Sequence, residues 1–187
     1  MARKMEKIYY AGLETPLGTM WAAASEKGLV QFNISDNREG FMSELKARIK
    51  AEYVEDPSKF KALRGELDRY FKGENLIFRG PFDMRGTPFQ VEVWKALHSI
   101  PYGKLTSYGG VAKQIGRPKA VRAVGNAVGD NPMGLIVPCH RVVSSNGGIG
   151  GFSTGLEWKR ELLAQEGIFD SPKGKPETGV DLRKFFR

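Results

Sequence analysis

Residues 105–132 read LTSYGGVAKQIGRPKAVRAVGNAVGDNP, and this stretch decides how the second half of the chain folds. Thr106-Ser107 supplies hydroxyl groups that cap a helix N-terminus, so a short helix is predicted over Tyr108–Ile115. A Gly-Arg-Pro turn follows, and it separates this helix from a second one over Lys119–Gly129. Two short helices joined by a tight turn are typical of a helix-turn-helix.

The second of these helices has an unusually smooth surface. Val121, Val124 and Val128 form one apolar stripe, and Arg122 is the only prominent basic side chain among alanines and glycines. A helix that reads the major groove normally presents several long side chains to the bases. Two interpretations remain open: the helix presses closely against a narrow groove, or its small residues let it pack tightly on another helix.

The flanking sequence extends this pattern in both directions. A helix is predicted from Thr87-Pro88, with Thr as cap and Pro in the first turn, to about Ser99. Downstream, the apolar run Leu135–Val137 predicts a short strand that leads into Cys139. A glycine-rich loop over residues 144–155 and a closing helix over Leu156–Gln165 complete this half.

The first half of the chain contains no chemical motif and reads as a structural unit. Its short apolar runs, separated by turn residues, predict an antiparallel meander followed by two helices and a further strand. The predicted strands are Lys7–Leu13, Thr19–Ala24, Leu29–Ile34 and Leu76–Phe82, and the predicted helices are Glu39–Ala51 and a helix that opens at Pro57-Ser58 and ends at Gly73.

These elements predict an α+β fold with a small antiparallel-sheet domain before a mainly helical domain, in which a short strand bears the cysteine. We place the first domain at residues 1–85 and the second at residues 86–170, with 81–86 as the linker. Residues 171–187 read as a C-terminal tail. Its basic and aromatic ending, RKFFR, could touch nucleic acid, but a frayed, solvated end is the interpretation we adopt.

Composition narrows the class of protein. The chain has 187 residues, of which 41% are hydrophobic and 27% charged, an ordinary globular mixture that excludes a fibrous or disordered protein. No apolar run approaches the roughly 20 residues of a membrane helix, and no signal peptide is recognisable, so we expect no membrane association and a cytoplasmic protein, or a nuclear one in a eukaryote. No oligomerisation surface is readable, and a monomer is expected.

The charge is unevenly distributed. The net charge is +8, and between Lys95 and Arg141 there are seven basic residues and one acidic residue. Such a concentration suggests a polyanionic partner, nucleic acid first, although a merely soluble basic surface explains it equally well.

Cys139 is the only cysteine, and His98 and His140 are the only histidines. A disulfide within the chain and a thiolate zinc site are therefore excluded, and no metal is expected. A lone cysteine is usually a small buried hydrophobe. Here His140 and Arg141 follow it directly, both able to stabilise a thiolate, and Glu166 is a candidate to orient the histidine.

The segment Pro138-Cys139-His140-Arg141-Val142 resembles the active-site motif of the O6-alkylguanine-DNA alkyltransferases, also called methylated-DNA–protein-cysteine methyltransferases. The resemblance extends from Thr87 to Gly167 with matching spacing. It includes PFQxxVWxAL, PYGKLTSYGGVA, RAVGNAxxxNP, IVPCHRVV and the GG-F-S-x-G loop. The first 80 residues resemble the family only in size and general layout.

The resemblance implies a role for each catalytic position. Cys139 would accept the alkyl group, and His140 would act through a bound water as its base. Glu166 would hold the imidazole tautomer, Tyr108 would donate to guanine N3, and Asn131 would brace the turn before the cysteine. No cofactor is implied.

The resemblance also implies how substrate is held. Ser153 would help hold O6, and the backbone carbonyls of Cys139 and Val142 would accept from the guanine amino group. Phe152 stands where many relatives carry Tyr, and Thr154 replaces a common Gly, which would narrow the pocket. The residues expected to contact DNA are Arg122, Ala123, Thr106, Ser107, Lys119 and Gly125.

The implied function is direct DNA repair, in which a flipped O6-alkylguanine, reached from the minor groove of double-stranded DNA, transfers its alkyl group to Cys139 in a stoichiometric suicide reaction. Arg122 would enter the space that the base vacates. Two alternatives stay open from the residues alone: a DNA-binding protein that senses alkyl lesions without transfer, and a cysteine hydrolase that uses Cys139 and His140.

Overall fold

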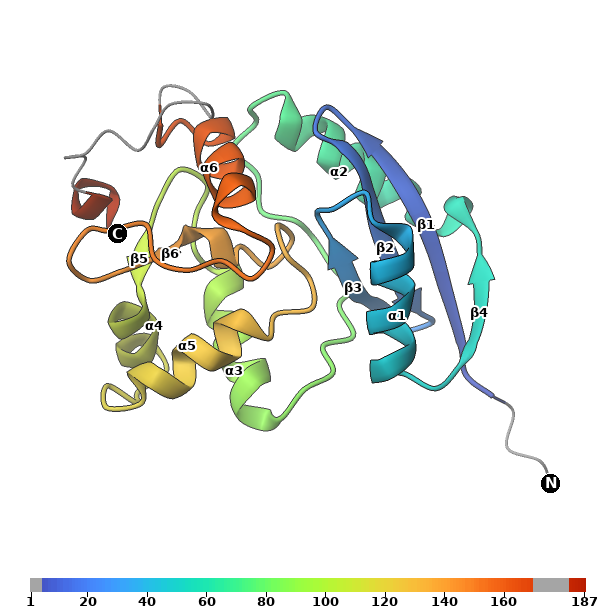
Figure 1. Cartoon of the computed structure of the whole chain (residues 1–187), viewed down its shortest axis with the longest axis horizontal. Coiled ribbons are helices and arrows are strands. Elements are labelled where there is room, and N and C mark those ends of the chain that lie inside the picture. Colours follow the sequence, from blue (N-terminus) through green and yellow to red (C-terminus); the bar gives the residue numbers. More distant parts are fainter. Residues whose placement is uncertain (1–4, 170–181) are drawn as a thin grey trace. The chain divides into compact units, whose positions relative to one another are not determined.

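The computed structural model describes residues 5–169 and 182–187 (Figure 1). These residues form two compact units. The first comprises residues 5–72 and 78–85, and the second comprises residues 73–77, 86–169 and 182–187. The predicted α+β class is confirmed, since the first unit contains a sheet and the second is mainly helical.

The first unit is built on a four-stranded sheet in the order β3-β2-β1-β4. Strands β1, β2 and β3 form the predicted antiparallel meander, and β4 joins β1 in parallel. The strands are β1 (Lys7–Thr15), β2 (Gly18–Ser25), β3 (Gly28–Asn33) and β4 (Glu52–Glu55).

The fourth strand was not expected, because the helix predicted over Glu39–Ala51 ends sooner than its periodicity suggests. Helix α1 spans Arg38–Arg48, and Ile49 adopts an extended conformation with φ −133° and ψ 120°. The chain then pairs with the edge of β1, where Ile8 lies opposite Tyr53. Pairing at an open sheet edge therefore outweighs three further residues of helix.

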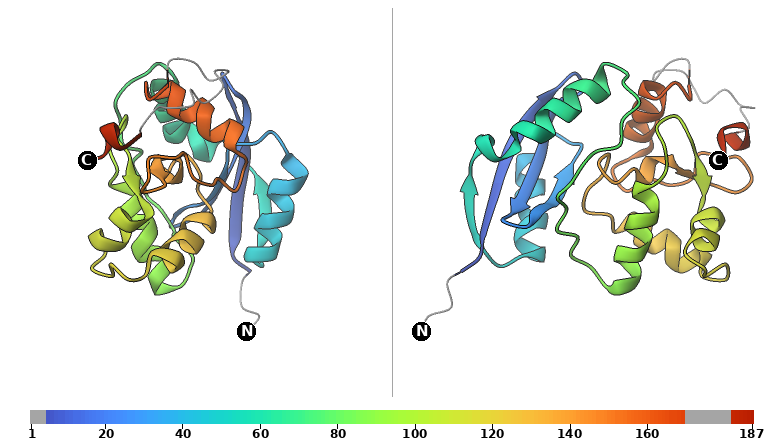
Figure 2. Two further views of the ribbon diagram at one scale, coloured as in Figure 1. Left: turned by 60° about the vertical axis from the view of Figure 1, so that its left-hand side comes forward. Right: turned by 180° about the vertical axis from the view of Figure 1, so that it is seen from behind.

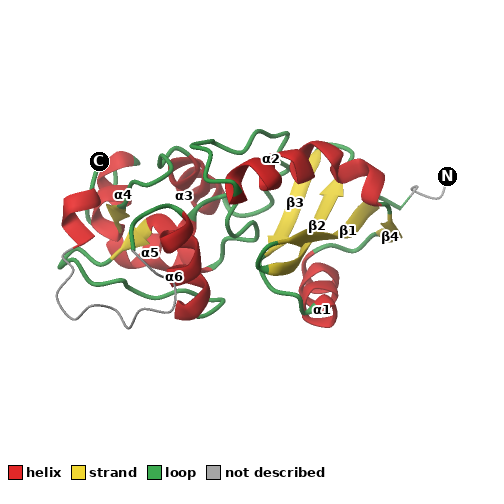
Figure 3. Cartoon of the chain, turned by 90° about the horizontal axis from the view of Figure 1, so that it is seen from above, coloured by secondary structure: helices red, strands yellow, loops and turns green. Residues whose placement is uncertain are grey.

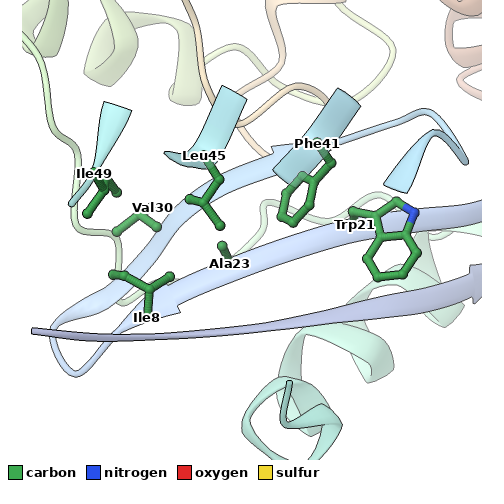
Figure 4. Close-up of a cluster of buried hydrophobic side chains, with 7 residues drawn as sticks. All are labelled: Ile8, Trp21, Ala23, Val30, Phe41, Leu45 and Ile49. Atoms are coloured by element: carbon green, nitrogen blue, oxygen red, sulfur yellow. The ribbon is translucent and has the colours of Figure 1, made fainter. Parts of the chain in front are cut away.

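The two faces of this sheet are covered differently (Figure 3). Helix α1 lies on one face, where Phe41, Leu45 and Ile49 pack on Ile8, Trp21, Ala23 and Val30 of the strands (Figure 4). Helix α2 (Lys61–Phe71), preceded by the 3₁₀ helix η1 (Pro57–Phe60), lies on the other.

The strand predicted over Leu76–Phe82 is absent from the structure. This segment makes a single bridge, between Phe82 and Leu29, and Leu29 donates from its N–H to the carbonyl of Pro81 at 3.0 Å. Phe78 is buried against Tyr70, with ring centroids 5.7 Å apart. The apolar residues that suggested a strand therefore reflect packing, and Pro81 removes one donor that a ladder needs.

The second unit contains the predicted helix-turn-helix (Figures 1 and 2). Helix α3 begins with a capping box between Thr87 and Gln90, and it packs with the two helices that follow. The elements are α3 (Pro88–His98), β5 (Thr106–Ser107), α4 (Tyr108–Gln114), α5 (Val121–Gly129), η2 (Cys139–Arg141), β6 (Val142–Val143), α6 (Leu156–Gln165) and η3 (Leu182–Phe185). No helix within the described ranges is both long and apolar enough to cross a membrane.

Two predicted elements near the cysteine differ from the structure. Leu135–Val137 is not a strand: Leu135 has φ 72°, and Cys139 donates from its N–H to the carbonyl of Val137 at 2.7 Å. Cys139 therefore lies on a 3₁₀ turn, and the short strand β6 begins three residues later, parallel to β5. A short buried apolar run satisfies its backbone with local turns as readily as with a ladder, so the pattern alone was ambiguous.

Two further boundaries are corrected. Helix α5 begins at Val121 because Lys119 belongs to the preceding turn, in which Ala120 donates to the carbonyl of Arg117 at 2.9 Å. The end of the expected C-terminal tail is also ordered. Residues 182–187 include the 3₁₀ helix η3, and Leu182 is buried, so this part is not a frayed end; residues 171–181 of the tail lie outside the described residues.

Candidate active site

Cys139 lies at the start of η2 with only 7% of its surface exposed. Burial raises the pKa of its thiol, whereas a hydrogen bond with the Asn131 side chain and the charge of Lys159 lower it. The thiol is therefore protonated at rest, but its surroundings already include a hydrogen-bond donor and a cation that stabilise a thiolate.

His140 is completely buried beside the cysteine. Its Nε2 lies 2.7 Å from Oε1 of Glu166, a residue at the C-cap of α6. Because a carboxylate accepts hydrogen bonds, this contact favours the tautomer with its proton on Nε2. Nδ1 is buried and has no hydrogen-bond partner in the part of the chain that the structure describes. Burial lowers the pKa of the imidazole, so His140 is neutral and Nδ1 is a basic nitrogen.

Glu166 is held as a carboxylate by a second partner, Arg141. The guanidinium donates from Nε and Nη2 to both carboxylate oxygens at 2.9–3.1 Å, and Gly103 adds its N–H at 3.2 Å. These partners, together with His140, outweigh the cost of burial and lower the pKa of Glu166 to about 2. Arg141 thus faces Glu166 and the carbonyl of Ile100, not the thiol that the sequence assigned to it.

Lys159 is the functional side chain that sequence reasoning missed. It belongs to α6, is 0% exposed, and donates from Nζ to the carbonyl of Val142 at 2.6 Å and to that of Gly151 at 3.0 Å. Burial lowers its pKa to about 8, while its interaction with Cys139 raises it. The sequence did contain a signal for this residue. Lys159 lies on the same helical face as Leu162 and Leu163, at i+3 and i+4, and a lysine on a buried helix face normally has a specific partner.

Asn131 and Tyr108 border the cysteine from the helix-turn-helix. Asn131 follows α5, and its side chain donates to the carbonyl of Val137 at 2.8 Å while accepting from the N–H of Met133 at 3.0 Å. It thereby ties together both ends of the turn that precedes Cys139. Tyr108 begins α4. Burial raises the pKa of its phenol, and a hydrogen bond with the backbone of Gly151 partly offsets this rise.

The remaining predicted site residues occupy three locations. Val142 lies in β6, while Phe152 and Ser153 lie in the glycine-rich loop, half-buried and exposed respectively. Thr106 is buried in the pairing with β6, and Ser107 caps α4 by accepting from the N–H of Gly110 at 3.0 Å. The residues on and before α5 are exposed or half-exposed: Lys119, Arg122, Ala123 and Gly125.

Comparison with known proteins decides the family. Residues 88–168 match the 6-O-methylguanine DNA methyltransferase DNA-binding domain, and residues 8–84 match the ribonuclease-like domain of the same proteins. A methylated-DNA–protein-cysteine methyltransferase of Methanosarcina acetivorans is 41% identical over 160 residues, which cover 86% of this chain and 99% of the relative. The chain belongs to the methylated-DNA–protein-cysteine methyltransferase family.

Solved structures of methyltransferases agree with this assignment. The Mycobacterium tuberculosis enzyme in complex with DNA is similar at a TM-score of 0.73 and 39% identity, over 84% of this chain and 92% of that one. The enzyme of the archaeon Pyrococcus kodakaraensis is similar at a TM-score of 0.60 and 25% identity, over 86% and 99%. The family match also includes residues 8–84, within a region in which sequence motifs had found only a general likeness.

Proposed function

We propose that this methyltransferase repairs DNA by transferring the alkyl group of O6-alkylguanine to Sγ of Cys139. The observation that carries the proposal is the buried series of Cys139, His140 and Glu166, in which a carboxylate fixes the imidazole tautomer beside the only thiol of the chain. Relatives solved with DNA supply the class of partner.

The chemistry requires an activated nucleophile and a stabilised leaving group. The thiol proton passes to Nδ1 of His140 through a bound water, Sγ attacks the alkyl carbon, and the bond between that carbon and O6 breaks. The guanine leaves as an anion, and a proton or hydrogen bond at N3 from the Tyr108 hydroxyl stabilises it. Glu166 stabilises the imidazolium that forms when His140 takes the proton.

The pocket that holds the base lies between β6 and the glycine-rich loop. The carbonyls of Cys139 and Val142 accept from the guanine amino group, and Ser153 holds O6 beside Phe152. Ser153 lies in the loop and is exposed, so its hydroxyl is solvated until the base binds and replaces water as its hydrogen-bond partner.

The base reaches this pocket only after it leaves the duplex, because the O6 substituent lies within the base stack. We assign this step to the surface of α5, where Arg122 and Ala123 are exposed and small residues allow close approach to the minor groove. Arg122 fills the space left by the base, with Thr106, Ser107, Lys119 and Gly125 near the DNA backbone. One chain carries every residue assigned to the site, so the proposed reaction needs no second copy of the protein.

The reaction consumes the protein. The thioether product is stable, and the chain has no second cysteine that could displace the alkyl group. One molecule therefore repairs one lesion.

A duplex that carries a labelled O6-methylguanine tests the proposal. The label should move to the protein with one methyl group per chain, on the peptide that contains Cys139, and Cys139→Ser should abolish transfer while DNA binding remains. Binding without transfer by the unmodified protein would instead indicate a lesion sensor, and absence of both would favour a hydrolase. Continued turnover with excess substrate would contradict the stoichiometric reaction.

A further inference from the structure

Residues 182–187 close the described chain and pack onto the second unit. Leu182 is 2% exposed and belongs to a cluster of buried side chains from four other parts of this unit. The cluster comprises Leu105, Val143, Leu163, Ile168 and Leu182, with Ile149, Phe169, Phe185 and Phe186 packed against it. The match to the DNA-binding domain of the family ends at residue 168, so these six residues lie outside the matched region.

The segment also pairs with the backbone just before β5. The N–H of Leu105 donates to the carbonyl of Phe185 at 3.0 Å, and the N–H of Arg187 donates to the carbonyl of Leu105 at 3.3 Å. Leu105 and Phe186 form a parallel bridge. The segment thus covers the free edge beside β5. Among the described residues the other partner of β5 is the two-residue strand β6, and so short a pair is marginal by itself.

Two further attachments extend to neighbouring parts of the site. The N–H of Leu182 approaches the carbonyl of Gly147 at 3.4 Å, and Ile149 packs on the same cluster, so the glycine-rich loop is attached at two points. The guanidinium of Arg187 donates to the carbonyl of Ser99 at 2.8 Å and to the side-chain carbonyl of Gln114, the last residue of α4.

These attachments converge on the two walls of the base pocket. Tyr108 begins α4 directly after β5, and the glycine-rich loop carries Ser153. Building on the proposed function, we propose that residues 182–187 act as a clasp that positions Tyr108 and the glycine-rich loop for binding the flipped base. Leu182 and Arg187 are positioning residues, since neither belongs to the reacting series of Cys139 and His140.

A physical reason for the clasp lies in the loop itself. The loop contains five glycines within residues 144–155, and glycine loses more conformational freedom on ordering than any other residue. Substrate binding would bear that entropic cost unless the loop is ordered beforehand. The clasp orders it through Leu182, while the bonds of His140 to Glu166 and of Asn131 to Val137 involve no residue of the clasp. Loss of the clasp should therefore weaken base binding and leave thiol chemistry intact.

Three variants and the full chain test this separation. The variants are a chain that ends at residue 181, Leu182→Ala, and Lys184→Ala as the matched control, because Lys184 is exposed in the same segment. For each protein we would measure saturation kinetics with free O6-benzylguanine, the rate of Cys139 alkylation by iodoacetamide, and circular dichroism at the assay temperature.

We expect the truncated chain and Leu182→Ala to need roughly tenfold more O6-benzylguanine for half-saturation, since substrate binding must then bear the cost of ordering the loop. Their iodoacetamide rates and helical signal should not fall, and Lys184→Ala should match the full chain. Unchanged half-saturation in the truncated chain would overturn the clasp, as would parallel losses of both reactions and of helical signal. Failure of the full chain itself to react with O6-benzylguanine would instead contradict the proposed function.

Discussion

Lys159 brings a positive charge into the interior beside the cysteine, and that position is costly. Its burial lowers its pKa to about 8, so near pH 7 it is still predominantly charged. Its two hydrogen bonds, to Val142 and Gly151, join the strand after the cysteine to the glycine-rich loop. The same ammonium lowers the pKa of Cys139, which makes Lys159 both a structural link and an electrostatic partner of the thiol.

Lys159→Met keeps the length of the side chain but removes the charge and both donors. We expect stability to fall by about 1–3 kcal/mol, because buried carbonyls lose their partners. The thiolate also loses its cation, so the pH profile of Cys139 alkylation by iodoacetamide should shift to higher pH. Lys95→Met, at an exposed position of α3, is the control and should change neither quantity. An unshifted profile would show that Lys159 has no electrostatic role.

Arg122 is the long exposed basic side chain of α5. Its proposed role is to fill the space left by the flipped base, and that space exists only in duplex DNA. Extruding a base costs a few kcal/mol, of which an inserted side chain offsets a part. Arg122→Ala should therefore slow transfer from an O6-methylguanine duplex by at least roughly tenfold while reaction with free O6-benzylguanine is retained. Thermal stability should change by less than about 0.5 kcal/mol, as for other surface positions. Equal losses with both substrates would assign Arg122 to the fold or the pocket.

Helix α5 has a low helix propensity because of its glycines, and the same small residues make its exposed surface smooth. Val124, Ala127 and Val128 are buried, whereas the other face consists largely of small residues. Each glycine costs roughly 1 kcal/mol relative to alanine inside a helix. Gly125 is half-buried, and a Cβ at this position would lie 3.9 Å from Cδ1 of Tyr108, an ordinary contact. The helix therefore has space for alanine here, and stability alone does not require glycine.

Gly125→Ala should accordingly raise the free energy of unfolding by up to about 1 kcal/mol. If α5 presses against the minor groove beside Tyr108, the added methyl group should at the same time slow transfer from duplex DNA. Gly129→Ala is the matched control, because its Cβ would meet nothing within 4 Å and it ends the same helix. Stability measured by denaturant unfolding, compared with duplex transfer rates, separates the two effects. A Gly125→Ala variant that is more stable but transfers from duplex DNA at an unchanged rate would show that DNA does not contact α5 at this position.

The buried ionic network makes the stability of the protein depend on pH in a defined direction. Glu166 has a folded-state pKa of about 2 against an ordinary value of 4.5, so its contribution is present above pH 4.5 and is lost as the pH falls toward 2. His140 has a pKa below its ordinary value of 6.5, so the unfolded chain binds a proton there before the folded chain does. Both groups make the unfolded state the better proton acceptor in acid.

We therefore expect the unfolding midpoint to decline as the pH falls below 6.5 and to decline further below 4.5. Glu166→Gln should weaken the second decline, to which Glu6 and Asp83 also contribute because Arg85 lowers their pKa values. It should be less stable at pH 7 by about 3–5 kcal/mol, because Arg141 is left buried without its carboxylate. Glu92→Gln, which breaks an exposed pair with Arg117, should cost at most about 1 kcal/mol. Thermal unfolding of the three proteins from pH 3 to 8 measures the difference. A Glu166→Gln variant that keeps the full decline below pH 4.5 would assign it to other carboxylates.

Local sequence was sufficient to predict a helix wherever the segment itself contains the capping residue or the apolar periodicity that defines it. The caps at Thr87 and Ser107 set the starts of α3 and α4, and the periodicity of Leu156–Gln165 matches α6 residue for residue. The spacing around Cys139 was specific enough to suggest the family that the comparisons then confirmed. Such features depend on neighbours within about four residues, so the sequence contains them explicitly.

Only the tertiary structure decided features that join distant segments. Strand β4 exists because β1 offers an edge, and Leu135–Val137 is a turn because local bonds and Asn131 satisfy its backbone. The sequence paired Arg141 with the thiol, although Glu166, which follows 25 residues later, holds it instead. Lys159 was overlooked for the same reason, since its partners lie in another strand and another loop. Burial and long-range partners determine these choices, and neither is a property of a short stretch of sequence.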